Sequence, residues 1–120
     1  MNASITIKGK CTSVIIDTCR KTTIIFETCM GSCEVVNSVR LHVWCMEKVP
    51  SVAIDKTDGI VLHLPLSSLD TEVIASKSSE MNISWPDEND EIYEKPIPEQ
   101  FKYKLIAAEK KIIAEVSDLY

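Results

Sequence analysis

The chain has 120 residues, which is enough for one domain with a single hydrophobic core. Its hydrophobic content of 45% is that of a globular protein and excludes simple disorder. The net charge of −5 argues against a nucleic-acid partner, because general nucleic-acid binders usually carry a basic balance.

The first 85 residues contain two interleaved series of short segments rich in β-branched residues. One series closes each time on a short polar residue, and its members are VIID (14–17), EVVN (34–37), VAID (52–55) and VIAS (73–76). The other series consists of ITI (5–7), TIIF (23–26), LHVW (41–44), IVLH (60–63) and NISW (82–85). Both series advance by roughly 20 residues, which is typical of a structural unit stacked on itself.

This period predicts an all-β fold, a parallel β-helix, over residues 1–86. The connections are too short for crossover helices, and the leucine pattern of leucine-rich repeats is missing. Equivalent residues of successive coils would then lie about 4.8 Å apart. The polar residues that close the first series would form one column at a corner, where they bond backbone groups of the turns. They are Asp17, Asn37, Asp55 and Ser76.

The remaining residues differ in character from the coils. Residues 87–100 are acidic and rich in proline, which predicts a connecting arm without regular structure. Residues 101–120 leave two alternatives open. Their apolar residues fit one face of a helix, and Ala-Glu-Lys-Lys favours helix, so the pattern alone slightly prefers that choice. The same residues also fit a hairpin in which KYKLIA and KIIAEV turn at residues 108–110.

The corner Lys77-Ser78-Ser79-Glu80 carries the residue types of a nucleophile and a base without their usual context. No Gly-x-Ser-x-Gly turn surrounds the serines, and no histidine lies nearby in the sequence. The chain has only three glycines and no glycine-rich phosphate loop. Cys29 and Cys33 form the one close cysteine pair, without a second pair at zinc spacing. We therefore expect no enzymatic activity, no cofactor and no metal.

Two further pairs have simple structural explanations. His42 and His63 are 21 residues apart, about one coil, so we expect them to stack as surface histidines, although neighbouring histidines also suit a metal. Asp17 and Asp55 would lie two coils apart, or about 9.5 Å, near the upper limit for an inverting glycosidase pair. The chain has few aromatic residues to line a sugar groove, so we expect these carboxylates to serve turns.

Positively charged residues follow the corners of the first series. They are Arg20, Lys21, Arg40, Lys56 and Lys77. In a β-helix they would form a positive ridge on an acidic protein, which suits docking of an acidic protein partner. Ordinary solvated turns would give the same pattern.

The sequence indicates a cytoplasmic location and free cysteines. No run of 18 apolar residues is present, and MNASITIKGK lacks the apolar core of a secretory signal, so we expect no membrane contact. The five cysteines are odd in number and confined to the first 45 residues, which argues against a disulfide framework. We expect them to fill small apolar spaces.

Three stretches closely resemble the C-terminal actin-binding domain of cyclase-associated proteins. They are KVPSVAIDKTDG (48–59), SLDTEVIASKSSEMNI (68–83) and PIPEQFK (96–102). The resemblance runs from about Ile5 to the C-terminus and implies a right-handed parallel β-helix. It also implies strands in place of a helix over residues 101–120, as a β-hairpin exchanged between the subunits of a homodimer. The dimerisation candidates are Phe101, Tyr103, Leu105, Ile112, Ile113 and Val116.

The resemblance also implies a function. Members of this family bind monomeric actin, prefer its ADP form and promote exchange of ADP for ATP, and they associate with the cytoskeleton. Binding one actin conformation more tightly than another shifts populations without covalent chemistry. The matching actin-facing candidates are Lys56, Thr57, Asp58, Lys77, Ser78, Ser79 and Glu80. The chain begins late compared with the family domain, so we expect a short form that lacks the N-terminal domain and the first coil.

A second β-helix family provides an alternative function. Domains similar to tubulin-folding cofactor C stimulate GTP hydrolysis through an inserted arginine. Arg40 is the only arginine that falls on an expected strand, so it is the candidate finger. Its neighbours do not match the motif of that family, which leaves actin binding as the leading interpretation.

Overall fold

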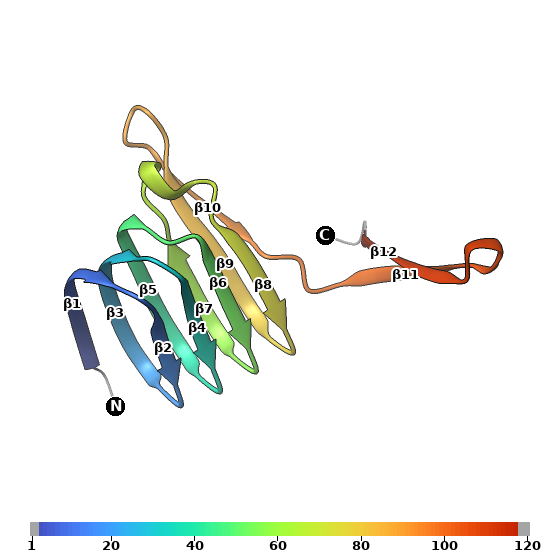
Figure 1. Cartoon of the computed structure of the whole chain (residues 1–120), viewed down its shortest axis with the longest axis horizontal. Helices are drawn as coiled ribbons and strands as arrows, with labels where there is room; N and C mark the ends of the chain where they lie inside the picture. Colours follow the sequence, from blue (N-terminus) through green and yellow to red (C-terminus); the bar gives the residue numbers. More distant parts are fainter. Residues whose placement is uncertain (1–2, 118–120) are drawn as a thin grey trace.

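Nine strands of this computed structural model, which describes residues 3–117, wind into a parallel β-helix (Figure 1). The larger sheet contains β1 (Ala3–Cys11), β3 (Arg20–Cys29), β5 (Val39–Lys48), β7 (Asp58–His63), β9 (Ser79–Pro86) and, at its edge, β10 (Ile92–Pro96). The smaller sheet contains β2 (Val14–Asp17), β4 (Ser32–Val36), β6 (Ser51–Asp55) and β8 (Glu72–Ser76). The chain alternates between the two sheets, as the interleaved series predicted, and the all-β expectation is confirmed.

The core lies between the two sheets because side chains alternate across each strand. In the larger sheet, Ile24, Val43 and Leu62 are in register and almost fully buried. In the smaller sheet, Val35 and Ile54 form the matching row from the other side. Each coil therefore contributes inward side chains from both sheets, and the coils are held together by stacking apolar residues on apolar residues.

The polar corner column differs from the expected one by a single position. The register aligns Asp17 with Val36, Val36 with Asp55, and Asp55 with Ser76. Asn37 lies one residue beyond that row, so its expected place in the column was wrong. The inward apolar residues set the register, because a slip by one residue would move every core side chain to the outer face.

The acidic arm is not irregular throughout. We expected a loop over residues 87–100, but Ile92–Pro96 forms β10, which runs antiparallel to β9. Asp87 closes this hairpin, because its Oδ1 accepts hydrogen bonds from the backbone N–H groups of Asn89 at 2.8 Å and Glu91 at 3.0 Å. This bonding is the usual way in which an aspartate stabilises a tight turn.

The C-terminal segment is a hairpin and not a helix. Strands β11 (Phe101–Ile106) and β12 (Lys111–Val116) pair antiparallel around a 3-10 turn at Ala107–Glu109. Lys110 closes the turn with a φ of 52°, at the place where the hairpin alternative required it. The hairpin extends away from the coils in Figure 1. The helical propensity of Ala-Glu-Lys-Lys therefore supports only the one 3-10 turn.

Within residues 3–117, no helix has the length and apolar character needed to cross a bilayer.

Candidate binding surface

The corner that connects the smaller sheet to the larger one repeats the same backbone conformation in four coils. Its first residue is left-handed at Thr18, Asn37, Lys56 and Lys77, with φ between 49° and 55°. Three residues later the chain is left-handed again, at Lys21, Arg40, Gly59 and Glu80. Non-glycine residues seldom adopt this conformation. Its repetition shows that the stacked turns impose it on whichever side chain occupies the position.

Hydroxyl groups inside the corner hold these turns together. Ser38 Oγ donates to Val36 O at 2.9 Å and accepts from the N–H of Cys19 at 3.1 Å. Ser78 Oγ repeats the pattern two turns further along the stack, donating to Ser76 O at 2.9 Å and accepting from the N–H of Thr57 at 3.1 Å. Each hydroxyl therefore satisfies its own turn and the turn of the preceding coil.

Two of the seven actin-facing candidates belong to this internal ladder. Thr57 is only 1% exposed, and its hydroxyl donates to Asp55 O at 3.1 Å. Ser78 is half-buried, with its hydroxyl occupied by backbone partners. Their position gives both residues a role in shaping the turn, and it leaves neither hydroxyl available as a nucleophile.

The other five candidates lie together on the surface of two adjacent coils. Lys56, Asp58, Lys77 and Glu80 are exposed, and the half-buried Ser79 donates to Asp58 Oδ1 at 2.6 Å. Most of them border a shallow hollow of about 430 Å³ at the corner. The corner can therefore offer two ammonium groups and two carboxylates to a protein partner without any rearrangement.

The positively charged residues form two columns instead of the single ridge expected from sequence. Lys56 and Lys77 occupy the first left-handed position of their turns, whereas Lys21 and Arg40 occupy the second. The second column continues into Gly59 and Glu80, so it changes from positive to negative along the stack. Arg20 lies beside Lys21, and with Arg40 and Glu80 it borders a second hollow of about 350 Å³.

The two histidines meet on the outer face of the larger sheet, as expected. His42 Nδ1 lies 3.0 Å from His63 Nε2, and the rings stack with centroids 5.3 Å apart. They are not register partners, because His63 lies opposite Trp44 and stacks on it at 3.7 Å. Burial and the neighbouring His42 lower the pKa of His63. Across residues 3–117 no three His, Cys, Asp or Glu side chains converge in a metal-binding arrangement.

The cysteines occupy the interior and the edges of the coils. All five are free thiols, and Cys29, Cys33 and Cys45 are buried. Burial raises the pKa of Cys33 to about 12 and that of Cys45 to about 11. Because the thiolate is the reactive form, these two groups are inert at neutral pH.

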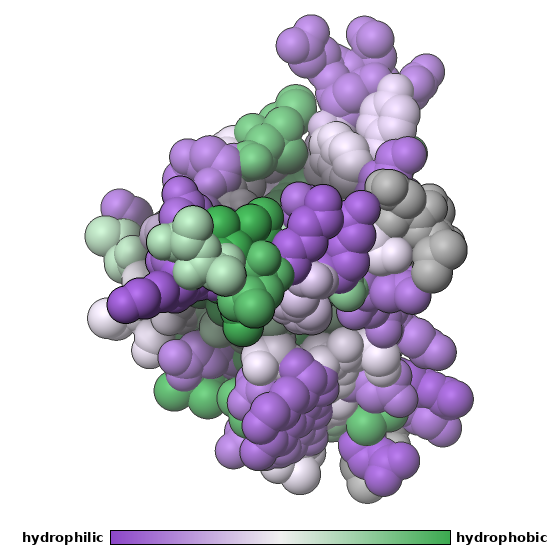
Figure 2. All heavy atoms as spheres, turned by 90° about the vertical axis from the view of Figure 1, so that its right-hand side faces the viewer, coloured by the Kyte–Doolittle hydropathy of each residue, from purple (hydrophilic) through white to green (hydrophobic). Residues whose placement is uncertain are grey.

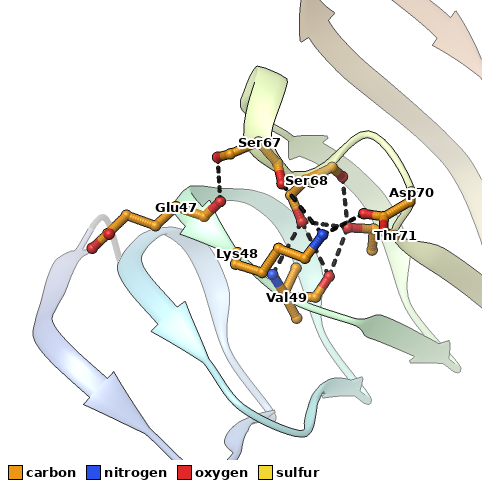
Figure 3. Close-up of polar contacts among 7 residues, drawn as sticks. All are labelled: Glu47, Lys48, Val49, Ser67, Ser68, Asp70 and Thr71. Atoms are coloured by element: carbon orange, nitrogen blue, oxygen red, sulfur yellow. Dashed lines mark hydrogen bonds and ion pairs between the residues drawn. The ribbon is translucent and has the colours of Figure 1, made fainter.

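A cluster of polar contacts between residues 47–49 and residues 67–71 was not recognised from sequence (Figure 3). The hydroxyl of Ser68, which is fully buried, donates to Val49 O at 3.1 Å and accepts from the N–H of Val49 at 3.0 Å. Lys48 reaches Asp70 at 2.6 Å, and this contact lowers the pKa of Asp70. The SLDT stretch carries no periodic signal, so only its match to the family motif could have drawn attention to it.

The last coil leaves an apolar end uncovered. Val73 and Ile83 point inward but are half-buried, and Ile74 is 63% exposed. Figure 2 looks onto the side of the molecule that carries the hairpin, where apolar side chains gather beside hydrophilic ones. Exposed apolar patches of this kind mark interaction surfaces.

The hairpin has one apolar face. Its register pairs Phe101 with Val116, Tyr103 with Ala114, and Leu105 with Ile112. Since alternate residues share a face, these six side chains lie together. The exposed fractions of Tyr103, Leu105 and Ile112 are 68%, 71% and 69%. Five of the six dimerisation candidates therefore lie on this face together with Ala114. The remaining candidate, Ile113, lies opposite Lys104 on the other face.

Comparison with known proteins gives one family. The chain matches the family model described as Adenylate cyclase associated (CAP) C terminal over residues 1–119. It is 47% identical over 104 residues to the adenylyl cyclase-associated protein of Dictyostelium discoideum, and 43% identical over 102 residues to human adenylyl cyclase-associated protein 1. Each match covers 85% of this chain but only 22% of the relative, so the chain spans about a fifth of the length of these curated relatives.

A solved structure supports the same conclusion. The crystal structure of cyclase-associated protein from Cryptosporidium parvum superposes with a TM-score of 0.75 and 25% sequence identity. The match covers 95% of this chain and 83% of that one.

Proposed function

Because this chain belongs to the C-terminal domain family of the adenylate cyclase-associated proteins, we propose that it is a binding module for monomeric actin. The observation that carries the proposal is the pair of stacked turns KTDG and KSSE. They match the family motif, and they present Lys56, Asp58, Lys77 and Glu80 outward on adjacent coils. The module acts by binding and has no covalent chemistry.

The finer part of the proposal concerns actin nucleotide exchange. A module that binds one nucleotide-dependent conformation of actin more tightly than another shifts actin toward the favoured conformation. By preferring ADP-actin and loosening its nucleotide, the module would return actin to the ATP form and assist filament turnover in the cytoplasm. The geometry supports surface binding, because the Ser78 hydroxyl is occupied by the backbone.

The test is the release of a fluorescent ADP analogue from monomeric actin, with and without this protein. We expect faster release with the wild-type chain and a loss of most of the acceleration in the double variant Lys56→Glu and Lys77→Glu. Lys104→Glu, on the hairpin, serves as the matched charge reversal away from the corner. Equal acceleration by the double variant, with its fold intact, would remove the corner from the proposal.

Salt dependence provides a second measurement on the same surface. Attraction between exposed charges is screened within about 8 Å at physiological ionic strength. We therefore expect the association rate with actin to fall steeply between low and high salt, while the dissociation rate changes less. A rate that is independent of salt would argue against docking through the charged corner.

We also propose that two copies exchange their hairpins. The apolar end of the last coil and the apolar face of the hairpin are both exposed within one chain, and the hairpin points away from its own coils (Figure 1). Packing the hairpin of one copy on the last coil of the other would cover both surfaces and the open edge at β8. The dimer would present two actin-binding corners.

A further inference from the structure

The outer face of the larger sheet carries an apolar hollow that the proposed actin-binding corner does not use. It has a volume of about 320 Å³ and lies where β5, β7, β9 and β10 run side by side. Its principal lining residues are Trp44, Met46, His63, Trp85, Ile92 and Glu94. The volume is at the lower end of the range for ligand pockets, about 300–1,000 Å³.

The floor of the hollow is one row across four strands. The register aligns Trp44 with His63, His63 with Ser84, and Ser84 with Glu94. Trp44 and His63 form a flat stack, with ring centroids 3.7 Å apart and planes within 6°. The register partner of His63 on β9, Ser84, is only 5% exposed. The row therefore offers a rigid aromatic platform that ends at a carboxylate.

The apolar walls are accessible to a ligand. Met46 and Ile92 are 53% and 68% exposed, and Trp44 is 40% exposed. Trp85 is held by a stacked contact with Tyr93, with centroids 6.0 Å apart. Exposed aromatic and apolar side chains around a preformed hollow are the usual composition of a recognition site.

The charges around the hollow have one sign. Glu94 is the charged residue in its lining, and it also accepts a hydrogen bond from Asn82 Nδ2 at 3.1 Å. The turn between β9 and β10 adds four carboxylates close by in the chain, at Asp87, Glu88, Asp90 and Glu91. No lysine or arginine is among the residues that line the hollow. A ligand that brings a cation beside Glu94 is therefore favoured electrostatically.

We propose that this hollow binds a proline-rich peptide segment that carries an arginine. Aromatic-lined grooves bind the preformed polyproline II helix with little loss of conformational entropy. Trp44 stacks on His63 and Trp85 on Tyr93, so two aromatic pairs border the hollow and offer flat surfaces on which prolines pack. An amphipathic helix about 10–12 Å wide would need a larger groove. The arginine is placed to pair with Glu94.

The fluorescence of the protein itself reports on occupancy. The chain has two tryptophans, Trp44 and Trp85, and both line the hollow. We would titrate the wild-type chain with the peptide Pro-Pro-Pro-Arg-Pro-Pro-Pro and follow the emission maximum, with peptide in buffer alone as a blank. The expected result is a saturable blue shift, as prolines displace water from the two indole rings.

Two altered peptides test the two parts of the ligand. Replacing the arginine by glutamate should weaken binding at least tenfold, because Glu94 then repels the peptide. Replacing the prolines by alanine should weaken it by a similar factor, because the backbone must then be ordered on binding. Equal binding of all three peptides would overturn the proposal, as would tighter binding of the alanine peptide.

Variants locate the site. Glu94→Lys should weaken the arginine peptide at least tenfold and improve the glutamate peptide, which a loss of folding cannot do. In the Trp44→Ala variant, Trp85 is the remaining reporter, and we expect the peptide to cause no blue shift. Met30→Ala, at a residue that is 63% exposed and lies outside the hollow, is the control variant and should bind like the wild type. Unchanged binding by both Glu94→Lys and Trp44→Ala would also overturn the proposal. The proposal would also be overturned if the peptide changed the NMR chemical shifts of backbone amides only outside the hollow.

Discussion

Ser68 illustrates how one buried hydroxyl organises an irregular corner. It bonds both backbone groups of Val49 and lies 2.7 Å from the hydroxyl of Thr71 (Figure 3). Ser68→Ala would leave the N–H of Val49 without a partner in a buried position, while the carbonyl of Val49 keeps its hydrogen bond from the hydroxyl of Thr71 at 2.7 Å. We expect the free energy of unfolding to fall by about 1–3 kcal/mol, as for other buried groups left unsatisfied. Urea denaturation measures this, and Ser67→Ala at an exposed neighbour should change it by less than about 0.5 kcal/mol.

His63 makes stability depend on pH in a defined direction. Its pKa in the folded chain is lowered, mainly by burial and then by His42, while Glu94 opposes the shift. The unfolded chain therefore binds more protons than the folded one below the unfolded value, near about 6.5. Stability should be full at pH 8 and should fall as the pH drops through 6.5 and below. Urea midpoints at pH 8, 6.5 and 5 measure this. His63→Gln should flatten the dependence, and an equally steep profile in that variant would exclude His63 as its source.

The residue scale also shows what sequence could and could not predict. The motif match selected KTDG and KSSE, and the structure brings both stretches to one corner. It could not separate Thr57 and Ser78, which bond the backbone inside the turn, from Lys56 and Lys77, which face solvent. That separation depends on φ values and on contacts between coils, which the linear pattern does not contain.

At the scale of the element, the repeated turn predicts the effect of changing its one glycine. Gly59 has a φ of 85° and shares its position with Lys21, Arg40 and Glu80, which carry side chains there. A Cβ at Gly59 would meet Arg40 backbone atoms at 3.5 Å, an ordinary contact, so only backbone strain remains. We expect Gly59→Ala to lower the free energy of unfolding by about 1 kcal/mol. Glu80→Gly is the reciprocal variant, because it relieves the same strain at the equivalent position. Thermal and urea unfolding measure both variants, and a stabilising Gly59→Ala would contradict the argument.

Strand periodicity predicted the stacked coils because the core needs alternate apolar residues in every turn. Asn37 was misplaced because it was aligned with Asp17 and Asp55 as a polar residue that closes its segment. The register instead follows the inward residues Val35 and Ile54, which pairs Val36 with Asp55. Strand periodicity also missed β10, because acidic residues and two prolines hide a strand whose side chains are all exposed. At residues 101–120 the pattern alone slightly preferred a helix, whereas the family resemblance implied the hairpin that the structure has, because the local preference for helix gives way to pairing between two strands.

At the scale of the whole molecule, the positive turns and the apolar surfaces lie in different places. The corner columns carry exposed lysines and arginines on a chain with a net charge of −5. The hairpin carries several of the exposed apolar groups, among them Tyr103, Leu105 and Ile112. Under the proposed function, this separation would let the module assemble with its own copy through one surface and meet actin through the other.

The apolar face of the hairpin therefore predicts the oligomeric state. Introducing charges with Leu105→Asp and Ile112→Asp places two carboxylates at a register pair on that face. Burying unpaired charges costs several kcal/mol, so we expect the dissociation constant of the proposed dimer to rise by at least about 100-fold. Light scattering after size exclusion should then give the mass of one chain, 13.4 kDa, across a concentration series.

Lys104→Asp is the matched control, since Lys104 lies on the other face of the same strand. It should leave the dimer intact, whereas a dimer that persists in the Leu105 and Ile112 double variant would exclude hairpin exchange through this face. Removal of residues 101–120 should give a monomer or an aggregate, because it leaves the last coil and the β8 edge uncovered. A soluble dimer of that truncated chain would place the interface elsewhere, on the coils themselves.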